Sequence, residues 1–174
     1  MTITYITGGV RSGKSDFAEK LASSQPGSVL YVAFGVVTDE EMKNRIQKHK
    51  DRRPDHWDVL EKPEELVGYQ SVYQNYDSIL VDCIGTWVAN RCMNISENKE
   101  EKVEIIQEAT EWLEEIRNLN QHLIIVSDEV GLGGIALSPL GRLFQDVLGK
   151  INQIVAEAAD EAFAVFSGLP VRLK

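Results

Sequence analysis

The sequence has few cysteines, no excess of basic residues and no long apolar run. Its two cysteines, Cys83 and Cys92, cannot form a disulfide framework and suit the reducing cytoplasm, where we expect the protein. Lysine and arginine total 18 against 27 aspartates and glutamates, and the net charge of −9 argues against nucleic acid and anionic membranes as partners. No apolar run approaches the roughly 20 residues of a membrane span, and the first residues lack the pattern of a signal peptide.

Repeats, low-complexity tracts and Pro/Gly-rich linkers are also missing from the sequence. A chain of 174 residues with 43% hydrophobic and 26% charged residues has the composition of a globular protein. It is long enough to bury a core of its own. We therefore expect a single domain over residues 1–174.

What the sequence does contain is an alternation of apolar runs and amphipathic segments. We predict strands over residues 2–6, 28–33, 78–82, 122–127, 162–166 and 170–173. We predict helices over residues 15–23, 38–50, 63–73, 99–117 and 138–158. Most of the strands are continuous apolar runs, which is typical of strands covered on both faces. The expected fold class is therefore α/β, a three-layer sandwich with a mainly parallel sheet.

The two longest predicted helices each have an apolar side. In 99–117 it is formed by Val103, Ile106, Ala109, Leu113 and Ile116. In 138–158 it is formed by Leu140, Phe144, Val147, Leu148, Ile151, Ile154 and Val155. These apolar faces fit either the core or an interface between subunits.

Residues 8–15, GGVRSGKS, match the phosphate-binding pattern G-x-x-x-x-G-K-[ST] at every fixed position. A predicted strand precedes the motif and a predicted helix follows it, which is the setting of a P-loop NTPase. Backbone N–H groups and the helix dipole would surround the phosphates. Lys14 is expected to reach the β- and γ-phosphates. The predicted nucleotide contacts here are Gly8, Gly9, Val10, Arg11, Ser12, Gly13, Lys14 and Ser15.

A P-loop also requires a carboxylate to help hold Mg²⁺, the expected cofactor. Asp82 ends the apolar run of residues 78–82, so we predict Ser15 and Asp82 as the metal site. Asp128 and Glu129, after the predicted strand 122–127, form a second candidate pair for Mg²⁺ or substrate.

A basic segment is the second unusual feature. Residues 43–53 contain six cations and one anion, a local charge of +5, and His49 lies among them. A neutral imidazole can attack a phosphate and form a covalent phosphoramidate. On these residues alone, a solvated basic helix face with an incidental histidine is the favoured interpretation.

Taken together, these residues resemble the bifunctional adenosylcobinamide kinase / adenosylcobinamide-phosphate guanylyltransferase family of cobalamin biosynthesis. The resemblance runs nearly end to end. It rests on TGGVRSGKS at 7–15, LYVA at 30–33 and DEEMKNRIQKHKDRRPDHW at 39–57, and on LVDCIGTWVAN at 80–90, VSDEVGLG at 126–133, LGRLFQDVLGKINQIVAEAADE at 140–161 and SGLPVRLK at 167–174.

The resemblance implies two reactions with ATP and GTP as substrates. A nucleoside triphosphate phosphorylates adenosylcobinamide, and GMP is then transferred from GTP through a guanylylated histidine. The motif histidine matches His49, which makes His49 and Lys14 the implied catalytic residues. Further implied nucleotide contacts are Ala33, Phe34, Gly35, Lys50, Asp51, Arg52, Arg53, Glu61 and Asp82. A homo-oligomer, such as a trimer, is also implied.

The sequence departs from the family pattern at three places. Phe34-Gly35 replaces small polar residues, Asp128 replaces asparagine, and the 134–136 segment lacks a proline. Two other functions remain open on the residues alone. One is a P-loop kinase of another small hydroxylated substrate, with His49 only electrostatic. The other is a nucleotide switch, which the absence of an N-K-x-D tetrapeptide disfavours.

Overall fold

A computed structural model describes residues 2–36, 40, 44, 47, 50, 53–61, 64–94 and 99–174. Its strands are β1 (Thr2–Gly8), β2 (Val29–Ala33), β3 (Asp58–Glu61), β4 (Ser78–Asp82), β5 (His122–Asp128), β6 (Glu161–Phe166) and β7 (Leu169–Arg172). Its helices are α1 (Lys14–Ser24), α3 (Gln70–Tyr73), α4 (Ile84–Met93), α5 (Lys99–Ile116) and α6 (Pro139–Ala158).

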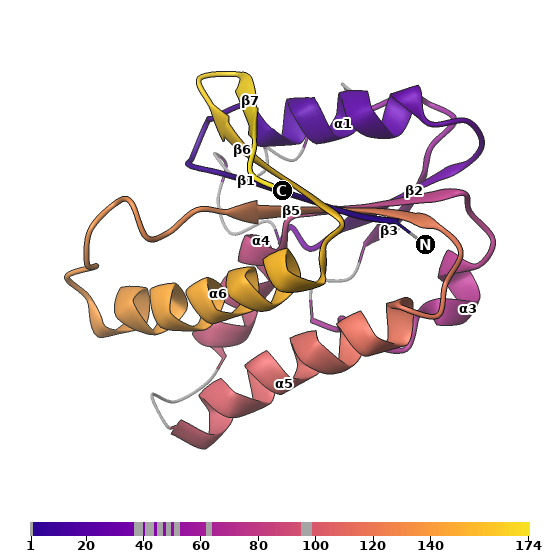
Figure 1. The fold of residues 1–174 in the computed structure, drawn as a ribbon. Helices are drawn as coiled ribbons and strands as arrows, with labels where there is room; N and C mark the ends of the chain where they lie inside the picture. Colours follow the sequence, from indigo (N-terminus) through magenta and orange to yellow (C-terminus); the bar gives the residue numbers. More distant parts are fainter. Residues whose placement is uncertain are drawn as a thin grey trace.

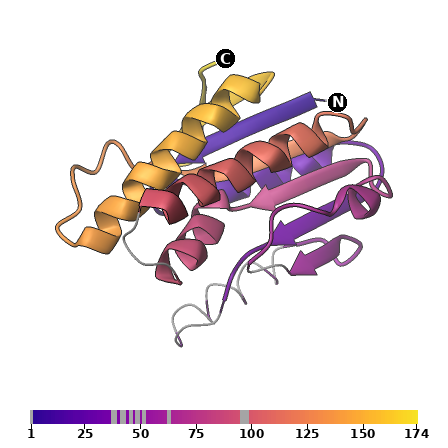
Figure 2. The ribbon, with the colours of Figure 1, turned by 90° about the horizontal axis from the view of Figure 1, so that it is seen from below.

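The strands form one seven-stranded sheet in the order β3-β2-β4-β5-β1-β6-β7. All neighbouring strands are parallel except the final pair, β6 and β7. Helix α1 lies on one face of the sheet, whereas α4, α5 and α6 lie on the other (Figure 1). Seen from below, α5 and α6 run side by side across that second face (Figure 2). The predicted three-layer α/β sandwich with a mainly parallel sheet is confirmed.

The central strands are buried because both faces of the sheet are covered. Side chains of β1 alternate between two hydrophobic clusters: Ile3 and Tyr5 belong to the cluster under α4–α6, and Ile6 belongs to the cluster under α1. Parallel pairing brings the carboxyl ends of β1, β2, β4 and β5 to one edge of the sheet. In an open α/β sheet this edge is where ligands bind.

The structure corrects several predicted elements. The helix predicted over 63–73 is wrong for most of its length, because residues 64–69 are not helical and only Gln70–Tyr73 form a helical turn. Strand β3 and helix α4 were not predicted. The helix predicted over 38–50 falls largely outside the described residues.

The apolar sides of the two long helices are also partly different from the prediction. In α5, Val103 is 60% exposed, while Ile105 and Trp112 are buried beside Ala109, Leu113 and Ile116. In α6, Leu140 is 44% exposed and Leu143 takes the buried position. The N-terminus of α6 is capped, since Ser138 Oγ accepts a hydrogen bond from the Gly141 N–H at 3.1 Å. None of the helices in the described part of the chain combines the length and the apolar character that crossing a membrane requires.

Candidate active site

The glycine-rich motif forms the turn between β1 and α1. The backbone turns sharply here, because Arg11 and Gly13 both have positive φ angles, of 58° and 90°. Gly8 has no room for a side chain: a Cβ there would lie 2.5 Å from Ser12 Oγ and 2.7 Å from the Val165 carbonyl oxygen. The local structure therefore requires glycine at the first fixed position of the motif.

The turn between β6 and β7 supports this loop from outside. The Gly168 N–H donates a 2.7 Å hydrogen bond to the Ser12 carbonyl. A Cβ on Gly13 would lie 3.1 Å from Gly168 Cα, so the two glycine backbones pack closely. Gly168 could not be assigned to the loop from the sequence, because only the packed fold brings residue 168 to it.

The motif lysine points to the sheet edge and is paired there. Lys14 Nζ lies 2.7 Å from Asp128 Oδ1, and its side chain is 11% exposed. Asp128 is opposite Gly8 in the parallel register of β1 and β5. Glu129, the other half of the second predicted acidic pair, is engaged differently, because its carboxylate accepts the N–H groups of Gly131 and Leu132.

Asp82 lies at the same edge, as predicted, and contacts the motif serine. Ser15 Oγ donates to Asp82 Oδ1 at 3.1 Å. Tyr31 in β2 donates its hydroxyl to Asp82 Oδ2 at 2.8 Å. Burial, followed by the nearby Asp82 charge, raises the Tyr31 pKa well above its usual value, so the phenol stays protonated as a donor. Tyr31 could not be singled out from the sequence, because it is part of an ordinary apolar strand pattern.

The basic segment reaches the site through one described side chain. The Arg53 guanidinium carbon lies 3.4 Å from the centroid of the Tyr31 ring, in a cation–π contact. Lys50 and Glu61, two predicted nucleotide contacts, form an ion pair with each other at 2.8 Å. The other predicted residues of the segment, His49, Asp51 and Arg52, lie outside the described residues.

The remaining predicted contacts differ in accessibility. Gly9, Val10, Arg11 and Gly35 are exposed, and Ala33 is half-buried at the end of β2. The Phe34 side chain is buried in the hydrophobic core, and its carbonyl accepts a 2.8 Å hydrogen bond from Asn90 Nδ2. The Phe34 ring is therefore turned away from any ligand at the sheet edge.

Cys83 lies between the two acidic residues of the site. Its thiol is 3.7 Å from Asp128 Oδ2. Burial, with the Asp128 and Asp82 charges adding to it, raises the pKa of the Cys83 thiol to about 12. The thiol is therefore neutral at physiological pH and contributes no charge to the site. Gly85, in the first turn of α4, leaves the space that the Asp128 carboxylate fills, because a Cβ there would overlap it.

This arrangement can bind a nucleoside polyphosphate and hold a divalent cation. The loop, Lys14 and the start of α1 provide positive groups for phosphate oxygens. Ser15 and Asp82 together offer the hard oxygen ligands that Mg²⁺ takes in nucleotide sites, where phosphates and water complete its coordination.

Comparison with known proteins agrees with this chemistry. The family model described as cobinamide kinase / cobinamide phosphate guanyltransferase matches residues 4–173. The bifunctional adenosylcobalamin biosynthesis protein CobU of Salmonella typhimurium is 38% identical, with 97% of this chain and 98% of that protein covered. Protein CobP of Pseudomonas aeruginosa, with the same description, is 36% identical, covering 97% and 95%. The Escherichia coli CobU protein is 32% identical, covering 97% and 98%. The chain therefore belongs to the cobinamide kinase / cobinamide phosphate guanyltransferase family.

Proposed function

We propose that this protein phosphorylates adenosylcobinamide and then guanylylates the phosphate, giving adenosylcobinamide-GDP for cobalamin biosynthesis. The observation that carries the proposal is the convergence of Lys14, Ser15 and Asp82 at the P-loop edge of the sheet. Family membership selects the acceptor, since P-loops serve many different reactions.

In the first reaction the acceptor hydroxyl oxygen attacks the γ-phosphorus of ATP or GTP. The new P–O bond forms as the bond to the β-phosphate oxygen breaks, a nucleoside diphosphate leaves, and the hydroxyl proton is released. Lys14 leaves its ion pair with Asp128 to contact the β- and γ-phosphates, where it offsets the charge that builds up. Because the ammonium is largely buried, solvent screens it little, which strengthens its effect on the phosphates.

A bound Mg²⁺ would supply positive charge that offsets the charge of the phosphates. Ser15 and Asp82 are the residues that would hold it. Tyr31 positions Asp82 by occupying one carboxylate oxygen, which leaves Oδ1 directed at Ser15. The Arg53 guanidinium lies over the ring of this tyrosine, so Tyr31 connects the basic segment to Asp82.

In the second reaction we propose His49 as the nucleophile. An imidazole nitrogen attacks the α-phosphorus of GTP, a P–N bond forms, and pyrophosphate leaves. A phosphate oxygen of the acceptor then attacks the same phosphorus and the P–N bond breaks. The cations around His49 in the sequence would stabilise charge on the attacked phosphate.

The test uses the wild-type protein with two radiolabels. With [γ-³²P]ATP or [γ-³²P]GTP, label is expected in adenosylcobinamide phosphate. With [α-³²P]GTP, label is expected on the protein in an acid-labile, base-stable form, as a phosphoramidate requires. Intact phosphorylation without protein labelling would leave a kinase alone, and absence of both would contradict the proposed function.

Tyr31→Phe tests the support of Asp82. The phenylalanine ring keeps the stack with Arg53, but the hydrogen bond to Asp82 is lost. We therefore expect the free energy of unfolding to fall by about 1.5–3 kcal/mol. We also expect phosphorylation to require a higher Mg²⁺ concentration. Urea unfolding and a Mg²⁺ titration of turnover measure the two effects. An unchanged Mg²⁺ requirement would show that Tyr31 does not position a metal ligand.

A further inference from the structure

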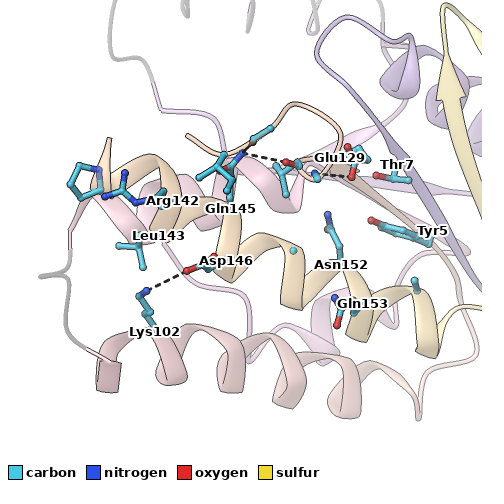
Figure 3. Close-up of a pocket in the computed structure, with 17 residues that line it drawn as sticks. Tyr5, Thr7, Lys102, Glu129, Arg142, Leu143, Gln145, Asp146, Asn152 and Gln153 are labelled. Carbon is cyan, nitrogen blue, oxygen red and sulfur yellow. Dashed lines mark hydrogen bonds and ion pairs between the residues drawn. The ribbon is translucent and has the colours of Figure 1, made fainter. Parts of the chain in front are cut away.

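An open groove of about 810 Å³ lies beside the P-loop, on the face of the sheet opposite α1. It runs between the ends of β1 and β5, the loop that follows β5, and helix α6 (Figure 3). This volume is at the upper end of the range for pockets that bind small molecules. Nothing in the P-loop chemistry described above uses this space.

The groove suits a large, mostly uncharged ligand better than a second phosphate. Its walls include apolar side chains, among them Val130, Ile135 and Leu143. Tyr5 and Thr7 of β1 line its end at the sheet (Figure 3). The charged groups at the rim have partners within the protein. Lys102 is 3.7 Å from Asp146, and Arg142 donates to the Leu137 carbonyl at 2.7 Å.

A glycine keeps the groove open from the helix side. Gly149 lies inside the 20-residue helix α6, where glycine is unfavourable for helix stability. No atom lies within 4 Å of the position that its Cβ would occupy, so packing against a neighbour does not account for the glycine. A side chain at position 149 would instead project into the groove that Gly149 lines.

Residues that line the groove are sequence neighbours of residues in the phosphate loop and its site. Thr7 lines the groove, and Gly8, the next residue, begins the loop. Glu129 lines the groove while its backbone N–H donates to the Gly8 carbonyl at 3.0 Å. Asp128, the preceding residue, holds Lys14. A ligand in the groove therefore lies next to the site where the γ-phosphate is transferred.

We propose that this groove binds the corrinoid acceptor, an inference that rests on the proposed function. The apolar walls take part of the corrin ring, and the side-chain amide of Gln153, which also lines the groove, faces its neutral amide substituents. The exposed aliphatic side chains of the loop after β5 extend the apolar surface beyond the groove, with Leu132 77% and Leu137 98% exposed. A corrinoid is larger than the groove, so the rest of it lies outside.

Gly149→Trp tests the proposal, with Lys150→Trp as the matched control. Lys150 is exposed on the same helix and does not line the groove. Cobinamide binding is measured by equilibrium dialysis, using the absorbance of the corrinoid itself. We expect Gly149→Trp to weaken cobinamide binding about tenfold or more and to raise the corrinoid KM equally. Lys150→Trp is expected to bind cobinamide as the wild type does, and both variants are expected to keep wild-type protein labelling by [α-³²P]GTP.

Ile135→Asp is a second variant that avoids the helix, and it is expected to weaken cobinamide binding without a change in folding, because Ile135 is so exposed. Wild-type affinity in both variants would overturn the groove assignment while leaving the proposed function intact. A change of oligomeric state in size-exclusion chromatography with unchanged cobinamide affinity would also overturn the groove assignment, because the groove would then be an interface between copies. If the wild type binds cobinamide through the groove but phosphorylates none, the proposed function fails and the binding site stands.

Discussion

Replacing Lys14 with methionine is expected to lower phosphorylation of adenosylcobinamide by about 10²- to 10³-fold, a loss typical of removing one preorganised group that stabilises transition-state charge. Methionine keeps much of the length and apolar stem of lysine but has no charge to offset that of the phosphates. Guanylylation is expected to fall as well, because the leaving pyrophosphate occupies the same loop. Transfer of ³²P from [γ-³²P]ATP to adenosylcobinamide measures the first effect.

The ion pair of Lys14 requires a control, since the Lys14→Met variant leaves Asp128 without its partner at 2.7 Å. The double variant Lys14→Met/Asp128→Asn removes that unpaired carboxylate. If the missing ammonium is the cause, the double variant is as inactive as the single one, and both unfold cooperatively in thermal melts. Recovery of activity in the double variant would contradict the assigned role, because the orphaned carboxylate would then have caused the loss.

The parts of the fold that were predictable have a local cause. The strand over 2–6, the loop over 8–15 and the helix after it follow from one apolar run, a glycine pattern and helical spacing that are contiguous in the sequence. Strand β3 was not predicted because its sequence, DVLE, has mostly exposed residues and no apolar run. It is the outermost strand of the sheet and has a neighbour on one side only. Helix α4 escaped because its buried positions, which include Gly85 and Asn90, do not form a simple apolar stripe.

The candidate site was also predictable only where the cause is local in the sequence. Asp82 and Asp128 could be selected from the sequence because each ends an apolar strand, but their partners could not be assigned. The Lys14–Asp128 and Tyr31–Asp82 contacts depend on which strands are neighbours. That order is a property of the packed sheet rather than of any short segment. The same holds for Gly168, which meets the loop only because β6 pairs with β1.

Replacing His49 with alanine is expected to abolish protein labelling by [α-³²P]GTP, a fall of roughly a thousandfold or more, because the nucleophile of a covalent step has no substitute. Phosphorylation of adenosylcobinamide is expected to remain, since Lys14 rather than His49 binds the transferred γ-phosphate. The two activities should therefore separate in this variant, which is the result that distinguishes a nucleophile from a residue required for folding.

The chain has only three histidines, so the choice of nucleophile can be tested completely. His56 is exposed in a turn near the basic segment, which makes His56→Ala the matched control. His122 begins β5, where its Nε2 lies 3.1 Å from Thr4 Oγ1, and burial lowers its pKa. His56→Ala and His122→Ala are both expected to retain labelling. Labelling that persists in His49→Ala and disappears in His56→Ala would transfer the nucleophile to His56, seven residues further along the chain.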